Sequence, residues 1–135
     1  MESKDLIQTA KEMGEFPTLL KAAKALDLME KYSTEGPYTI FAPVESAFEP
    51  IPDSVIDDAF EDLDYLRDII SYHIVEGRYS SEDLRENTTL TTTGGNKLRL
   101  REKDGKIFVE NTPILKPDIE CSNGIIHSIG DILVP

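Results

Sequence analysis

The spacing of apolar residues changes along this chain, from helical in most of the first half to strand-like in the second. The clearest helical segment is residues 62–74, where apolar side chains recur on one face. The clearest strand signal is Asp104-Gly105, a typical two-residue hairpin turn, which places Leu100 opposite Val109 on an apolar face. Helices that come first and strands that come later predict an α+β fold rather than alternating βαβ winding.

Residues that begin or end secondary structure indicate the boundaries of the elements. Ser3 is a suitable N-cap for a first helix. Pro17 suits the first turn of a second helix, which we expect to end at residues 35–37. The elements expected after it are a strand at 38–42, short helical pieces at 45–60, a helix at 62–74, a short helix capped by Ser80, and strands at 88–93, 97–103, 106–110 and 125–134.

Length and charge exclude several classes of protein. The chain has 135 residues, the length of one domain, and we expect a single domain over residues 1–135. Its net charge of −12 argues against nucleic acid as a partner and against docking on an anionic membrane. No apolar run reaches the roughly 18 residues that would predict a membrane span.

The N-terminal residues leave two cellular locations open. Residues 1–13 lack the basic region and the apolar region of a signal peptide. The protein is therefore expected either in the cytoplasm or, if a signal has been removed, outside the cell. The lone thiol of Cys121 does not choose between them, because a protein without disulfides survives in both compartments.

Acidic residues concentrate in residues 45–68. This segment contains nine acidic residues and only one basic residue, Arg67. The simplest interpretation is a solvated helical surface. The alternative is a surface that attracts cations or a basic partner.

The sequence lacks the motifs of common catalytic and cofactor sites. It has no glycine-rich phosphate loop, no metalloprotease motif and no calcium loop, so we expect no cofactor, no metal and no catalytic residue. Cys121 and His127 would have to meet at hydrogen-bond distance to form a catalytic pair, and Cys121 is more simply a small buried residue. His73 lies on the apolar face of its helix, where a buried imidazole needs a hydrogen-bond partner; a pH switch or a recognition contact is the alternative.

Three segments resemble motifs of the fasciclin-like (FAS1) domain family. They are residues 36–43 (GPYTIFAP, continuing to Ala47-Phe48), residues 72–79 (YHIVEGRY) and residues 118–127 (DIECSNGIIH). Their order and spacing match the family over essentially the whole chain. The sequence departs from the pattern at residues 44–46 (VES), where the family usually has Thr followed by Asn or Asp.

The resemblance implies a fold and a class of function. The implied fold is a wedge of two β-sheets with helices packed around it. The implied function is that of a non-enzymatic binding or adhesion module, which recognises a protein or polysaccharide partner at the cell surface or in the matrix. The alternative is an intracellular single-domain protein that acts as a scaffold or in stress, with an unknown ligand.

The resemblance also implies candidate recognition residues. In animal matrix members of the family, recognition has been attributed to a Tyr-His motif and an Asp-Ile pair. The matching positions here are Tyr72, His73, Asp118 and Ile119. Because Pro117 removes a backbone donor, we expect the residues around Asp118 to lie at a sheet edge or turn and to be exposed.

Overall fold

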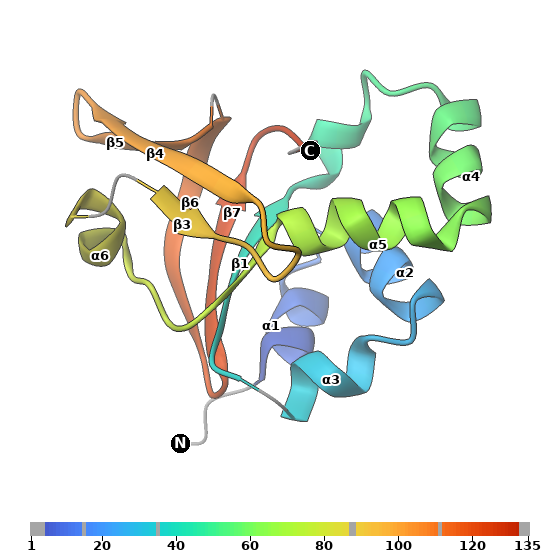
Figure 1. The fold of residues 1–135 in the computed structure, drawn as a ribbon, viewed down its shortest axis with the longest axis horizontal. Helices are drawn as coiled ribbons and strands as arrows, with labels where there is room; N and C mark the ends of the chain where they lie inside the picture. The colour runs from blue at the N-terminus through green and yellow to red at the C-terminus, as the bar shows by residue number, and fades with distance from the viewer. Residues whose placement is uncertain (1–4, 15, 35, 87–88, 111, 133–135) are drawn as a thin grey trace.

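The structure combines helices and strands in the predicted order. The computed structural model describes residues 5–14, 16–34, 36–86, 89–110 and 112–132. Its elements are α1 (Leu6–Met13), α2 (Pro17–Ala25), α3 (Met29–Thr34), β1 (Tyr38–Pro43), the 3-10 helix η1 (Glu45–Phe48), α4 (Asp53–Glu61), α5 (Leu63–Tyr72), β2 (Ile74–Glu76), α6 (Ser81–Glu86), β3 (Thr89–Thr91), β4 (Lys97–Lys103), β5 (Lys106–Val109), β6 (Thr112–Cys121) and β7 (Gly124–Ile129). The α+β class is confirmed (Figure 1). Of the described helices, none has both the length and the apolar character needed to cross a bilayer.

The strands form a bent sheet with the order β2-β1-β7-β6-β5-β4-β3. β6 pairs with β7 on one side and β5 on the other, and its register with β7 shifts on both sides of Lys116. Figure 1 shows β3, β4 and β5 lying across β1 and β7, so the sheet closes into the wedge that the resemblance implied. The predicted hairpin is confirmed, with Leu100 opposite Val109.

The parallel pair of β1 and β7 forms the centre of the fold. Every residue from Tyr38 to Pro43 and from Gly124 to Ile129 is buried, because both faces of these strands are covered. Gly124 lies directly opposite Tyr38, and a Cβ atom at residue 124 would collide with the Tyr38 backbone carbonyl. The close approach of the two backbones therefore requires glycine at this position.

Two hydrophobic clusters lie on opposite faces of the central strands. Ile40 and Ile126 belong to the cluster beneath α1, α2, α3 and α5, which we call the helix-side cluster. Phe41 and Ile129 belong to the cluster that also contains β4 and β5 residues, which we call the wedge cluster. Because side chains alternate along a strand, neighbouring residues of β1 enter different clusters.

The turn between β6 and β7 fastens two helices to the sheet. Oδ1 of Asn123 accepts a hydrogen bond from Leu6 N at 2.9 Å, and its Nδ2 donates to Tyr32 O at 2.8 Å. Leu6 N is one of the amides that the first turn of a helix leaves without an internal partner. One side chain thus connects the start of α1 and the backbone of α3 to the centre of the sheet.

The N-terminal helices differ from the prediction in two ways. Ser3 lies outside the described residues, and the N-cap of α1 is Asp5, whose side chain accepts a hydrogen bond from Gln8 N at 2.8 Å. The single helix predicted from Pro17 to residues 35–37 is wrong, because Asp27 adopts a left-handed φ of 58° and separates α2 from α3.

β6 is a strand that the sequence analysis did not predict. It contains Pro113 and Pro117, which usually argue against an interior strand. The expectation of a sheet edge around Asp118 is confirmed, because β5 pairs only with Thr112 and Pro113, and the part of β6 around Asp118 pairs with β7 alone. The register shifts with β7 accommodate the irregular backbone there. The expected exposure is confirmed, since residues 115–118 are exposed.

The last strand is also shorter than predicted. β7 ends at Ile129, residues 130–132 are not part of a strand, and residues 133–134 lie outside the described ranges. The predicted start of this strand is therefore nearly correct, and its predicted end lies too far along the chain.

The packing of the central strands makes a specific prediction for Gly124→Ala. The added methyl group would meet the Tyr38 backbone, which cannot move without breaking the β1–β7 register. We expect a loss of at least about 2 kcal/mol in the free energy of unfolding, measured by urea denaturation. Gly130→Ala is the matched control: its Cβ would lie 3.8 Å from the Leu115 side chain, and we expect a change within about 1 kcal/mol. Equal unfolding midpoints for the two variants would contradict the proposed constraint.

Candidate functional site

Tyr72 and His73 stand at the end of α5 and enter opposite faces of the sheet. Tyr72 belongs to the wedge cluster, and His73 lines cavities on the helix side. Leu66 and Ile70 share the buried face with His73 as predicted, whereas Leu63 is 45% exposed and does not join it. Adjacent positions in the sequence therefore serve two different parts of the core.

His73 is a fully buried and satisfied histidine. Its side chain is 1% exposed, and Nδ1 lies 2.7 Å from Ile69 O, one helical turn earlier. Because a carbonyl can only accept, Nδ1 carries the hydrogen. Burial lowers the pKa of His73 to about 4, although the hydrogen bond to Ile69 acts in the opposite direction. The imidazole is therefore neutral at physiological pH.

Tyr72 has a weak polar contact at the end of its ring. Its hydroxyl donates to Glu110 Oε1 at 3.5 Å. Burial, followed by the charge and hydrogen bond of Glu110, raises the pKa of the Tyr72 phenol. Tyr72 therefore remains a neutral packing residue with its hydroxyl at the boundary of the wedge.

Asp118 lies on the irregular part of β6 and is held by α6. It adopts a left-handed φ of 57°, and its two carboxylate oxygens accept hydrogen bonds from Ser81 N at 2.7 Å and Ser81 Oγ at 2.5 Å. Partial burial acts to raise the pKa of Asp118, but the two Ser81 hydrogen bonds and nearby His127 outweigh it and lower the pKa. Ile119 is half-buried and packs against the helix-side cluster. Of the four predicted recognition residues, Asp118 alone is exposed.

His127 connects β7 to two other segments within the wedge. Its Nδ1 accepts a hydrogen bond from Asp118 N at 3.1 Å, so Nε2 carries the hydrogen and donates to Tyr79 O at 2.7 Å. The ring stacks on Phe41 with centroids 5.7 Å apart, and burial lowers its pKa. Both ring nitrogens are occupied by the backbone, which leaves neither of them to act as a base toward Cys121.

Cys121 is a buried thiol. It is 2% exposed, and burial raises the pKa of its thiol. Its expected role as a small buried residue is confirmed. Within the described residues, no three His, Cys, Asp or Glu side chains lie close enough to hold a metal ion.

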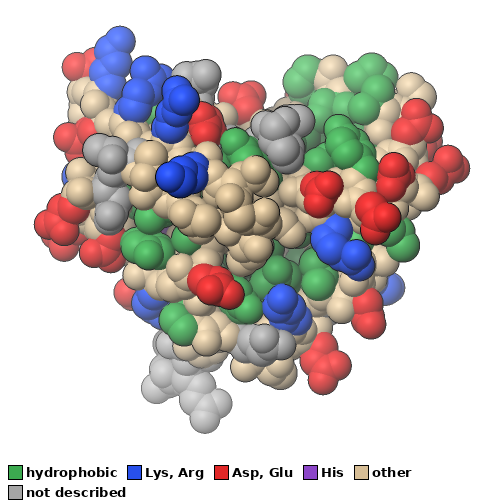
Figure 2. Space-filling model, viewed as in Figure 1, with side chains coloured by type: hydrophobic (Ala, Val, Ile, Leu, Met, Phe, Trp, Pro, Cys, Tyr) green, Lys and Arg blue, Asp and Glu red, His purple; other side chains and the backbone are tan. Residues whose placement is uncertain are grey.

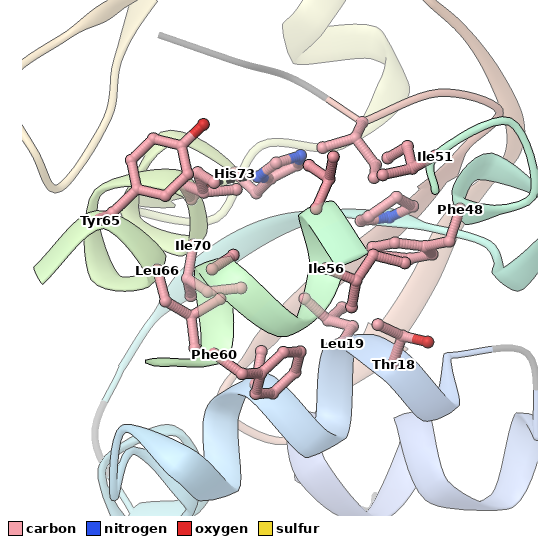
Figure 3. A pocket seen from close by; sticks show the side chains of 16 residues that line it. Thr18, Leu19, Phe48, Ile51, Ile56, Phe60, Tyr65, Leu66, Ile70 and His73 are labelled. Atoms are coloured by element: carbon pink, nitrogen blue, oxygen red, sulfur yellow. Dashed lines mark hydrogen bonds between the residues drawn. The ribbon is translucent and has the colours of Figure 1, made fainter. Parts of the chain in front are cut away.

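An apolar pocket opens on the helix side, beside His73. It has a volume of about 210 Å³. Figure 3 shows Phe48, Ile51 and Ile56 facing Tyr65 and Leu66 across it. Its lining residues are Thr18, Leu19, Ala22, Pro43, Phe48, Ile51, Val55, Ile56, Ala59, Phe60, Tyr65, Leu66, Ile69, Ile70, His73 and Ile132. We call this cavity the apolar pocket; its side chains offer contact to an apolar group and almost no hydrogen bonds.

The helix α4 forms one wall of this pocket without being buried itself. None of its residues is buried, and Val55 is 51% exposed. Across the pocket, Tyr65 of α5 is 47% exposed. This site was not predicted from the sequence, because the short helical pieces expected at 45–60 gave no indication of what their apolar side chains would contact.

The burial of His73 predicts a specific dependence of stability on pH. The folded chain binds the proton with a pKa of about 4, against 6.5 for an ordinary histidine. The unfolded chain therefore binds more protons in this range, and the stabilisation present above pH 6.5 is lost as the pH falls toward 4. Between about pH 7 and pH 5, we expect wild type to lose about 2 kcal/mol relative to His73→Gln in urea melts. Both proteins contain the same carboxylates and His127, so the titration of these groups affects both stabilities equally and cancels in the difference. A difference in the free energy of unfolding that stays constant with pH would contradict the assignment.

Comparisons with known proteins place the chain in a family. The fasciclin domain model matches residues 14–135. Protein sll1483 of Synechocystis sp. is 33% identical over 132 residues, which cover 96% of this chain and 73% of that protein. Human periostin is 30% identical over 98% of this chain, which corresponds to 16% of periostin.

A further relative and a solved structure agree with this match. The cell surface glycolipoprotein MPB83 of Mycobacterium bovis is 28% identical over 74% of this chain and 44% of that protein. A FAS1 domain pair from the insect cell adhesion molecule fasciclin I has the same fold, with a TM-score of 0.78 at 20% identity, over 99% of this chain and 52% of that chain. The chain belongs to the fasciclin domain family.

Proposed function

We propose that this chain is a non-enzymatic binding module that recognises a partner protein at the cell surface or in the matrix. The observation that carries the proposal is the apolar pocket, the lining of which is suited to contact rather than to chemistry. A site that binds through surface complementarity needs no nucleophile and no general base.

The state of the titratable core residues supports binding over catalysis. A general base must reach a substrate proton with a free nitrogen or oxygen. The His127 ring is hydrogen-bonded to the backbone at both nitrogens, and the Cys121 thiol is buried. His73 touches the apolar pocket, but burial lowers its pKa to about 4, which makes the imidazole a weak base, and its Nδ1 is hydrogen-bonded to Ile69 O.

The chemistry of the pocket favours a protein over a polysaccharide. Sugar hydroxyls lose hydrogen bonds to water on binding, and they need polar groups that replace them. Among the sixteen lining residues, Thr18, Tyr65 and His73 are the ones with polar side chains. An apolar side chain of a protein gives up no hydrogen bonds to water by entering such a pocket, and it gains the free energy of apolar burial.

Two relatives carry a location in their names, which supports the extracellular part of the proposal. MPB83 is named as a cell surface glycolipoprotein, and fasciclin I is named as an insect cell adhesion molecule. We propose a corresponding location for this chain.

Asp118 is the exposed member of the four residues suggested by the family resemblance. It is preorganised by Ser81, and Ile119 lies next to it. We propose that this pair contributes a secondary contact, and that Tyr72 and His73 act by packing.

The proposed function is tested by screening the purified chain on protein and glycan arrays. We expect reversible binding to at least one protein, and mass spectrometry of the recovered partner should show an unchanged mass. An unrelated folded protein of similar negative charge is the control for nonspecific attraction. No protein bound above this control, glycans as the only ligands, or a partner altered in mass would each contradict the proposal.

A further inference from the structure

We propose that the apolar pocket is the docking site for a basic segment of a partner protein, which inserts apolar side chains between α4 and α5. This inference deepens the proposed function and rests on it. It follows from the apolar lining of the pocket, from the exposure of α4, which forms one of its walls, and from the acidic residues around its mouth.

The pocket is large enough to accept a side chain. A dry protein cavity of about 150 Å³ can bind benzene. The 210 Å³ available here therefore accommodates one aromatic or branched aliphatic side chain, with room for part of another. The exposed side chains of Val55 and Tyr65 extend the apolar surface to the mouth, where the backbone of a partner would lie.

The surface next to the mouth is acidic. A second, polar hollow adjoins the apolar pocket and shares Thr18, Phe48, Ile51 and Ile56 with it. Its remaining lining residues are Glu45, Glu49, Asp53 and Asp57, with Lys21 as the one basic residue. Figure 2 shows acidic side chains at the right-hand edge of the molecule, over α4, beside a group of hydrophobic ones.

These acidic groups are available to a partner. Thr18 Oγ1 donates to Glu45, and the Lys21 ammonium lies 4.9 Å from the centre of the Phe60 ring. Within the described residues, no lysine or arginine forms an ion pair with Glu49, Asp53 or Asp57. Lysine or arginine side chains that flank an apolar anchor would therefore find unpaired carboxylates at the rim.

Charge also argues against other occupants. A fatty acid or an anionic membrane would bring negative charge to an acidic rim. A second copy could present its basic β4–β5 hairpin, which Figure 2 shows at the upper left. However, two chains of net charge −12 repel each other, and the hairpin tip from Lys103 to Lys106 has no apolar side chain that could enter the pocket.

The occupant consistent with these constraints is an amphipathic segment of a basic protein. Its anchors would be one or two bulky apolar residues spaced by three or four positions on a helix, as in other helix-in-groove complexes. Its flanking residues would be Lys or Arg. The acidic segment 45–68 would then attract a basic partner, the alternative interpretation given in the sequence analysis, and the apolar pocket beside it would hold the partner's apolar side chains.

Designed peptides provide the direct test. A fluorescent helical peptide with Leu and Phe anchors and Lys flanks should bind the full chain, as measured by anisotropy. The same peptide with Glu in place of Lys, or Ser in place of the anchors, should bind at least tenfold more weakly. Addition of salt should weaken the Lys peptide and leave a neutral apolar peptide nearly unchanged.

Variants of the chain locate the binding. Ala59→Phe fills the pocket and should weaken the Lys peptide at least tenfold. Asp53→Asn combined with Asp57→Asn should weaken it about five-fold, which is typical of two exposed charge pairs. Asp104→Asn, at the tip of the distant hairpin, removes one charge and should have no effect. Circular dichroism and urea melts confirm that each variant folds.

A second measurement applies if Ala59→Phe does not fold. The Lys peptide should shift the NMR methyl signals of Ile56 and Ile69, and leave those of Ile107 and Ile125, which lie outside the pocket, in place. Shifts at the distant methyls alone would overturn the inference.

The remaining outcomes separate this inference from the proposed function. Equal binding of Lys and Glu peptides, binding of small apolar molecules but no peptide, or a salt-sensitive oligomer in light scattering would overturn the basic-partner assignment. If the arrays yield a partner that is insensitive to these variants, the inference fails and the proposed function stands. If neither arrays nor peptides show binding, both fail.

Discussion

The in-register parallel pairing of β1 with β7 is the constraint on which the rest of this structure depends. It joins residues 38–43 to residues 124–129 and buries both strands on both faces. The helix-side cluster and the wedge cluster are therefore two sides of one pair of strands. The position of α5 is tied to the same pair, because Phe41 N donates to His73 O at 2.8 Å. The apolar pocket borders this frame through Pro43 and His73.

Buried polar groups give the central strands their specificity. Thr39 is fully buried; its hydroxyl donates to Gly77 O at 2.8 Å and accepts from Tyr79 N at 2.9 Å. His127 holds the same loop from β7 through Tyr79 O, and it holds β6 through Asp118 N. A shift of one residue between β1 and β7 would leave these groups without partners, at a cost of about 1–3 kcal/mol for each. Residues 72–79, which form one of the three family motifs, thus help to maintain the register between β1 and β7.

The parts of the fold that the sequence predicted are those set by local patterns. The Asp104-Gly105 turn determined the register of its hairpin, and the apolar face of α5 correctly indicated that His73 is buried. β6 was missed because its two prolines resemble a turn, and only its pairing with β5 and β7 makes it a strand. The break at Asp27 was missed because an aspartate in left-handed conformation has no strong local signal. The apolar pocket was missed because it is assembled from α2, η1, α4 and α5, whose relative positions depend on long-range packing.

Native-state hydrogen exchange tests the central claim most directly. If β1 and β7 form the rigid frame and α4 is a half-covered wall of the pocket, the amides of residues 39–42 and 125–128 should exchange only by global unfolding. The amides of α4 should exchange through local opening at a clearly lower free energy, because none of its residues is buried. Amides of β1 or β7 that open at a lower free energy than those of α4 would contradict this account of the fold.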